Sequence, residues 1–353
     1  MVTAVLLPLA LMHSSANAEP FERKVFAMGT ELSISLEGVS RKQAVEHSEA
    51  VLKLVRTAEN RLSTWKADSE LSHLNLSPVN QSIVLSPELS SDLRGAVECE
   101  TETNRAFSPA LAPLVKAWGM RTGGKQPADS EWKSAFLNSG TKHFQFTLNA
   151  GTNTLSVTKK SNHAGFEEGG FGKGAALDEA IAYLKKNGVK DALLNFGGQI
   201  AMITENAKTV EVADPSDRQR KLLTFRTDAP SIATSSNSVH RNVAVVNGRM
   251  KTIGHLLNPL NGKPIEHGGS ITVLHSSALK ADCRTKVFVL GAKRALDWAN
   301  RNQERILILR PGSRKGQWIA ETSCDWNAPL DADISRLKWI KPTHCKKEKE
   351  RTL

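Results

Sequence analysis

The stretch EEGGFGKGAALDEAIAYLKKNGVKDALLNFGGQIAMI, residues 167–203, sets the pattern of the chain. A glycine-rich run comes first, followed by apolar residues at helical spacing up to Gly188 and by two apolar runs separated by Gly197 and Gly198. Apolar residues three and four positions apart predict an amphipathic helix, and glycine is typical of a helix end. The paired glycines predict a break between two strands. We therefore expect a loop, a helix and two strands in succession.

The glycines of this run, with Lys173 among them, allow two interpretations. Glycine lets backbone N–H groups approach an anion, and a helix start adds a favourable dipole, so the run could hold a phosphate with Lys173 as its counter-charge. The run matches neither the GxxxxGK[ST] loop nor the GxGxxG fingerprint. A simple turn before an amphipathic helix explains the same residues equally well.

Strands and helices are intermixed on both sides of this stretch. Alternating polarity from Thr30 predicts a half-buried strand, and apolar spacing behind an N-cap at Ser40 predicts a helix to Leu62. The pattern also predicts helices at 87–104, at 109–118 behind Ser108 and Pro109, at 277–290 and at 292–302, strands at 242–246 and 271–275, and hairpins within 144–159 and 305–321. Without a regular βαβ alternation, we expect an α+β fold of mainly antiparallel or mixed sheets with packed helices.

The first eighteen residues, MVTAVLLPLALMHSSANA, differ from the rest of the chain. An apolar run that ends in Ala-Asn-Ala predicts a secretory signal cleaved after Ala18, and the alternative is a buried or interfacial segment. The run is too short to span a bilayer, and no later segment is long and apolar enough to do so. We expect a periplasmic protein with one domain over 19–323 and an extension over 324–353.

Charge and cysteine spacing exclude several classes. A net charge of +11 would attract anionic partners, but the basic residues are scattered and the chain has a single tyrosine, which argues against nucleic-acid binding. The cysteines include no CxxC and no short Cys/His spacing, which argues against a zinc site. Cys324 and Cys345 bracket a C-terminal segment and could form a disulfide, or remain two free thiols.

Asp282 and Thr285 lie three residues apart on the predicted helix 277–290, so their oxygens share a face. A carboxylate and a hydroxyl suit a hard cation such as Mg²⁺. The alternative is that Asp282 merely lies near a helix start and Thr285 packs in the core. His255 precedes an apolar pair and, taken alone, is a structural histidine.

A collinear set of short motifs is more specific than any one of them. The motifs are AMGT (27–30), LSTWKADSELSHLN (62–75), FSPALAPLVKAWG (107–119), GGFGKGAALD (169–178), NFGGQ (195–199), ATSSN (233–237), GHLLNPLNGKP (254–264) and ADCRTKVFVLG (281–291). In this order they resemble the ApbE family, the FAD:protein FMN transferases. The resemblance covers about residues 25–322.

This resemblance implies an exported, magnesium-dependent enzyme. Such an enzyme splits FAD, attaches FMN through a phosphoester to a Thr or Ser of a partner flavoprotein, and releases AMP. The resemblance implies that Asp282, Thr285 and the backbone carbonyl of Gly172 bind the metal, with Asp282 also counted as catalytic. Lys173 would lie near the pyrophosphate, and Trp65 would stack on the flavin.

The resemblance also implies further FAD-pocket positions, namely Met28, Gly29, Asp178, Gly197, Gly198, Thr234 and His255. Of these, His255 is the candidate for handling a proton.

The chain departs from the family at several of these motifs. The family separates its metal-binding Asp and Thr by four residues rather than three, and Arg284 here adds a positive charge between them. Ser108, Asn258, Ser236 and Glu168 also replace the usual residues. Two other functions therefore stay open: a catalytically degenerate FAD-binding protein that serves a periplasmic redox partner, or an FAD pyrophosphatase that gives FMN and AMP.

Overall fold

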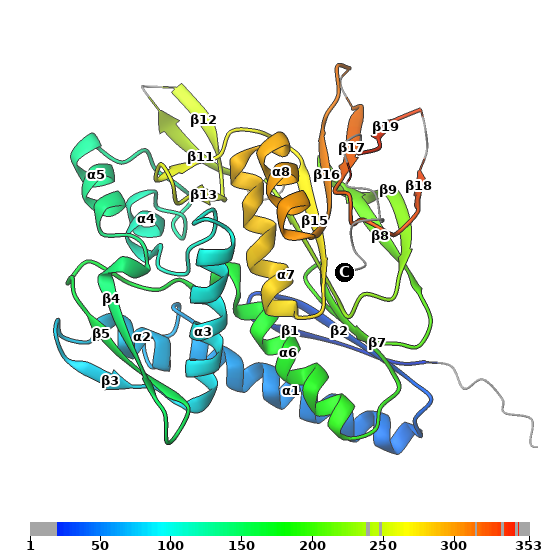
Figure 1. Cartoon of the computed structure of the whole chain (residues 1–353), viewed down its shortest axis with the longest axis horizontal. Helices are drawn as coiled ribbons and strands as arrows, with labels where there is room; N and C mark the ends of the chain where they lie inside the picture. Colours follow the sequence, from blue (N-terminus) through cyan, green and yellow to red (C-terminus); the bar gives the residue numbers. More distant parts are fainter. Residues whose placement is uncertain are drawn as a thin grey trace, which may run out of the picture.

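The computed structural model describes residues 20–237, 241–246, 249–314, 316–332, 335–342 and 345 (Figure 1). The predicted signal peptide, residues 1–18, lies outside this range. No helix within it has the length and apolar character needed to cross a membrane.

The helices of the described chain agree largely with the sequence pattern. They are α1 (Arg41–Leu62), α2 (Glu70–Leu76), α3 (Pro87–Glu102), α4 (Ala112–Ala117), α5 (Asp129–Leu137), α6 (Gly172–Lys186), α7 (Ala278–Arg284) and α8 (Ala292–Asn302), with the 3₁₀ turns η1 (Thr141–His143), η2 (Glu168–Gly170) and η3 (Thr285–Leu290). Ser40 caps α1 through a capping box, as expected.

Two predicted helices differ from the structure. The helix expected at 109–118 begins only at Ala112, because the Ser108 hydroxyl accepts from the Ala110 N–H instead of capping a helix. The helix expected at 277–290 changes to 3₁₀ geometry at Thr285, whose hydroxyl donates to the Asp282 carbonyl at 2.6 Å. A hydroxyl that bonds back to the preceding turn competes with the regular helical pattern.

One large sheet forms the centre of the molecule. Its strands follow in the order β1 (Phe21–Ala27), β2 (Thr30–Glu37), β6 (Asp191–Phe196), β7 (Gln199–Ile203), β10 (Ser231–Ser236), β15 (Ser270–His275), β16 (Arg305–Pro311), β17 (Trp318–Thr322) and β19 (Leu337–Ile340). Neighbouring strands are antiparallel except for β17 and β19, which confirms the α+β expectation.

Smaller sheets surround the large one. They are β3 (Ser82–Val84) with β5 (Thr154–Lys159) and β4 (Phe144–Asn149); β18 (Leu330–Ala332) with β9 (Asp217–Thr227) and β8 (Lys208–Asp214); β11 (Arg241–Val246) with β12 (Arg249–Gly254); and β13 (Leu257–Asn258) with β14 (Lys263–Pro264).

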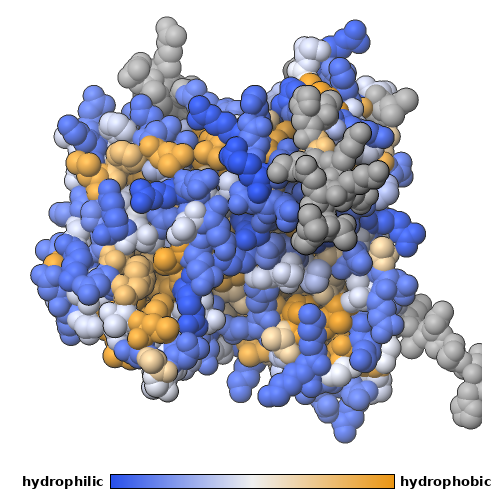
Figure 2. Space-filling model, in the orientation of Figure 1, coloured by the Kyte–Doolittle hydropathy of each residue, from blue (hydrophilic) through white to orange (hydrophobic). Residues whose placement is uncertain are grey.

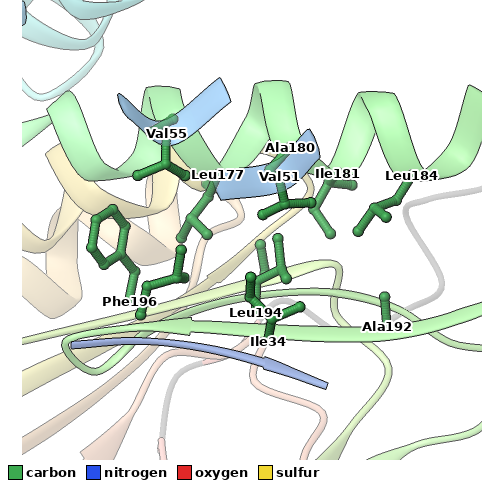
Figure 3. Close-up of a cluster of buried hydrophobic side chains, with 14 of the residues drawn as sticks. Ile34, Val51, Val55, Leu177, Ala180, Ile181, Leu184, Ala192, Leu194 and Phe196 are labelled. Carbon is green, nitrogen blue, oxygen red and sulfur yellow. The ribbon is translucent and has the colours of Figure 1, made fainter. Parts of the chain in front are cut away.

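The large sheet is covered on both faces. Alternate residues of β2 and β6, such as Ile34 and Leu194, point toward Val51 and Val55 of α1 and Leu177 of α6 (Figure 3). The other face packs against β8 and β9, and its strands there contribute Met202, Ile232, Leu274, Leu307 and Leu309. On the face shown in Figure 2, hydrophobic residues lie in separate patches among hydrophilic ones.

Two disulfides connect distant parts of the chain. Cys324 and Cys345 are bonded within the predicted C-terminal extension, whose strands β18 and β19 pair with β9 and β17. Cys99 and Cys283 join α3 to α7 across 184 residues, a pairing that the sequence did not predict.

Gly174 explains part of the glycine-rich run by packing alone. A Cβ on this residue would lie 2.6 Å from the Cα of Leu279 and even closer to the carbonyl oxygen of Ala278, so α6 and α7 are in backbone contact here. Because both atoms belong to the backbone of α7, a side chain could be accommodated only by moving that helix.

We therefore expect Gly174→Ala to lower the free energy of unfolding by about 1–3 kcal/mol, although alanine favours a helix. Gly169→Ala is the matched control, since its Cβ would contact only Glu167 Oε1 at 3.9 Å. Urea unfolding of both variants measures the difference, and equal stability would show that the α6–α7 contact is not tight.

Candidate functional site

Two adjoining pockets lie beside the start of α6. One, of about 320 Å³, is lined among others by Phe107, His255 and Lys286, and the other, of about 500 Å³, by Met28, Gly29 and Lys173. Both are lined by Trp65, Glu167 and Gly169. The structure thus brings together five of the predicted FAD-pocket residues: Met28, Gly29, Trp65, Lys173 and His255.

Met28 and Gly29 form the tight turn between β1 and β2, with φ of 41° and 76°. Gly197 and Gly198 form the matching turn between β6 and β7, with φ of 64° and 89°. A Cβ on Gly197 would lie 2.7 Å from the Thr30 hydroxyl, so this glycine lets the two turns pack together. Gly197 and Gly198 do not line either of the two pockets.

Asp178 positions α7. Its carboxylate accepts hydrogen bonds from the Ser277 hydroxyl at 2.6 Å and from the backbone N–H groups of Ala278 and Leu279 at 2.7 and 3.0 Å. A carboxylate at a helix N-terminus satisfies free donors and complements the helix dipole. The predicted FAD-pocket residue Asp178 therefore acts on the helix that carries Asp282.

Thr234 lies on β10 and pairs with the Thr272 hydroxyl at 2.9 Å on the neighbouring strand. The next residue, Ser235, points to the opposite face, because side chains alternate along a strand. Its hydroxyl lies 2.7 Å from that of Thr285. Ser235 therefore joins the predicted metal ligands, whereas Thr234, predicted for the FAD pocket, lines neither of the two pockets.

Asp282 is buried, with 5% of its surface exposed, and lines neither pocket itself. Its Oδ1 accepts from the Lys286 ammonium at 3.0 Å, while Oδ2 is buried and makes no hydrogen bond among the described residues. Burial alone would raise the pKa of the Asp282 carboxyl. The ammonium groups of Lys286 and Lys173 outweigh burial and hold this pKa below its ordinary value, so the carboxylate stays charged.

Lys286 contacts two of the three predicted metal ligands, Asp282 and Thr285, and also Ser235. Besides Asp282 Oδ1, its Nζ lies 2.9 Å from Thr285 Oγ1, 3.1 Å from the Asp282 carbonyl oxygen and 3.2 Å from Ser235 Oγ. Gly170 makes room for the lysine stem, because a Cβ there would lie 3.4 Å from Lys286 Cε and 2.8 Å from Phe107 Cε2. The Lys286 ammonium group is thus surrounded by oxygen atoms that could also bind another cation.

The described residues contain no group of three or more His, Cys, Asp or Glu side chains that could hold a metal. Gly172, the third predicted ligand, is the first residue of α6, and a Cβ there would contact Glu168 at 3.2 Å. Any metal in this cluster would depend on a single carboxylate, that of Asp282.

Glu167 and Arg121 form a second charged group where the pockets meet. Arg121 donates to Glu167 Oε2 at 2.6 Å and lies 4.6 Å above the centre of the Trp65 ring. Trp65 remains 67% exposed, which leaves an aromatic surface open. Glu168, at a departure from the family pattern, is buried and accepts a hydrogen bond from Thr64.

Sequence reasoning missed Lys286, Ser235, Arg121 and Glu167. The i,i+4 spacing of Asp282 and Lys286 was a usable signal, because such a pair can form an ion pair on one helix face. Arg121 and Glu167 approach across 46 residues, for which no local pattern exists.

Comparison with known proteins shows which family the chain belongs to. The family model described as "ApbE family" matches residues 28–309. The chain belongs to the ApbE family. This membership confirms the resemblance that the collinear motifs indicated.

Relatives in the ApbE family are distant in sequence. A Salmonella typhimurium protein named FAD:protein FMN transferase is 26% identical over 317 residues, which cover 87% of this chain and 89% of that protein. A Vibrio cholerae protein of the same name is 27% identical over 267 residues, covering 73% of this chain and 77% of that protein.

Solved structures share the fold. The flavin transferase ApbE from Vibrio cholerae superposes with a TM-score of 0.72 at 23% identity, covering 87% of this chain and 98% of that one. The ApbE protein from Thermotoga maritima gives 0.75 at 22% identity, covering 87% and 97%.

Glu167 should make stability depend on pH. Its burial, reinforced by Glu168, raises its pKa from 4.5 to about 7, despite the opposing effect of Arg121. The unfolded chain loses this proton near pH 4.5 and the folded chain only near pH 7, so the stabilisation is complete at low pH and is lost as the pH rises through 7.

We expect the wild type to lose on the order of 1–3 kcal/mol more than Glu167→Gln between pH 4.5 and pH 7.5. Loss of the Arg121 contact changes the stability of the variant but not its pH slope. Urea unfolding at several pH values measures both profiles, and parallel profiles would contradict the raised pKa.

Proposed function

We propose that this ApbE-family chain transfers FMN from FAD to a Thr or Ser hydroxyl of a target flavoprotein and releases AMP. The observation that carries the proposal is the pair of pockets that joins an exposed aromatic ring, Trp65, to two ammonium groups, Lys173 and Lys286. An aromatic face suits a flavin ring, and fixed cations suit a diphosphate. The names of the relatives support the same activity.

The transfer is a displacement at phosphorus. The acceptor oxygen forms a bond to the FMN-side phosphorus as the bond to the bridging oxygen breaks, and AMP leaves with the electron pair. The hydroxyl proton passes to a base, for which His255 is the candidate from sequence. Glu167, with a pKa of about 7, lines the same pocket as His255. Fixed positive groups aimed at the phosphates lower the barrier.

The folded donor set does not fit the magnesium ion that the family resemblance implies. Mg²⁺ prefers six oxygens at about 2.0–2.1 Å, but the oxygens of Asp282, Thr285 and Ser235 already surround Lys286. Two unit positive charges 4 Å apart repel by about 4 kcal/mol at an effective dielectric constant of 20, and a divalent ion doubles this. The magnesium dependence that the resemblance implies is therefore not part of this proposal, and no step of the reaction is assigned to the ion.

We also propose a periplasmic location. The signal-like pattern of residues 1–18 and the two disulfides support it, since disulfides persist in oxidising compartments.

Incubation with FAD and candidate exported flavoproteins tests the transfer. We expect one acceptor to gain the mass of an FMN group with equimolar AMP, and an acceptor lacking its Thr or Ser to gain none. Trp65→Ala should weaken FAD binding about tenfold, because stacking on an aromatic ring contributes about 1–3 kcal/mol. Trp339→Ala, a change on β19, is the matched control.

Two outcomes would contradict transfer. Release of free FMN and AMP, with no labelled acceptor, would indicate a pyrophosphatase. Stoichiometric FAD binding without AMP release would indicate a flavin-binding protein.

A further inference from the structure

The Lys286 ammonium ion has the surroundings of a bound metal ion. Carboxylate, hydroxyl and carbonyl oxygens from β10, α7 and η3 lie within 2.9–3.2 Å of its Nζ. These are the oxygen types that a hard cation prefers, but the distances are those of hydrogen bonds. A lysine thus satisfies the buried charge of Asp282, which would otherwise need another cation.

The same ammonium ion is accessible from the ligand side. The side chain of Lys286 is 16% exposed and lines the pocket that also contains Trp65 and His255. Lys173 lines the adjoining pocket, which shares Trp65, Glu167 and Gly169 with the first. An anion in these pockets would therefore meet two fixed positive groups.

The start of α6 adds to this positive field. Phe171, at the cap position of this helix, has no side-chain oxygen and makes no capping hydrogen bond. The first backbone N–H groups of a helix lack partners within it and carry partial positive charge. Gly172 and Lys173 occupy these positions, so N–H groups and ammonium ions converge beside Asp282.

We propose that Lys286 replaces the divalent ion in this chain. Its ammonium group supplies the fixed positive charge for the FAD diphosphate, so FAD binding and FMN transfer proceed without a divalent metal. The claim about metal-free FMN transfer rests on the proposed transferase function. The claim about metal-free FAD binding rests on the geometry around Lys286 alone. Lysine is suited to this role, because it binds phosphate as a compact point charge.

Lys286→Met tests this proposal, because methionine keeps most of the stem and removes the charge. Lys293→Met is the control, since Lys293 is 90% exposed on α8. Three quantities are measured for each protein: Mn²⁺ binding by electron paramagnetic resonance, FAD binding by flavin fluorescence in EDTA, and FMN transfer in EDTA or Mg²⁺.

The wild type and Lys293→Met should bind no Mn²⁺ in the Asp282 cluster, and their FAD affinity should be the same in EDTA and in Mg²⁺. Lys286→Met should lose about tenfold or more of its FAD affinity in EDTA, because a charged hydrogen bond to phosphate is removed. The vacated oxygens should then bind Mn²⁺, and Mg²⁺ should restore part of the affinity.

Two results would overturn the proposal: one tightly bound Mn²⁺ per wild-type chain with FAD binding abolished by EDTA, or unchanged FAD affinity of Lys286→Met in EDTA. If Lys286→Met fails to fold, Mn²⁺ binding and EDTA sensitivity of the wild type decide whether the proposal holds. Transfer that occurs only with Mg²⁺ would refute the lysine role and leave the transferase function intact. If FAD binding resists EDTA and depends on Lys286 but no transfer occurs, the transferase function is refuted and the role of the lysine is supported.

Discussion

The close approach of α6 to α7 at Gly174 is the constraint on which the site depends. Without a side chain at Gly174, the backbone of α7 lies directly against α6. Asp178 of α6 then receives three hydrogen bonds from the start of α7 and orients it. This contact places Asp282 beside the first turn of α6, which carries Lys173. The glycine-rich run therefore serves helix packing and places Lys173 at the start of α6.

Burying Asp282 in this contact creates a need for positive charge. A charged carboxylate in a low-dielectric interior is costly unless a cation and hydrogen bonds compensate it. Lys286 provides that cation through contacts to Asp282, Thr285 and Ser235. Because the lysine also faces the pocket of Trp65, the group that stabilises the buried acid is the group that can meet a phosphate. Stability and ligand binding thus share one ammonium ion.

The helices and the central strands could be predicted because their signals are local. Ser40 caps α1, and Gly188 follows the end of α6, as the spacing indicated. The grouping of Asp282 with Thr285 also follows from helical spacing.

The i,i+4 spacing of Asp282 and Lys286 indicated that these two residues could pair, but not that Lys286 would also contact Thr285 and Ser235. Whether the Lys286 side chain turns inward depends on the space beside Gly170 and on the hydroxyl of Ser235, which come from distant parts of the chain. The most direct test of the role of Lys286 is a crystal structure with FAD and Mn²⁺, in which manganese is located by anomalous scattering. The account predicts a diphosphate oxygen within hydrogen-bond distance of Lys286 Nζ and no manganese among the oxygens of Asp282, Thr285 and Ser235. Manganese bound to Asp282 and Thr285, with Lys286 turned away, would contradict it.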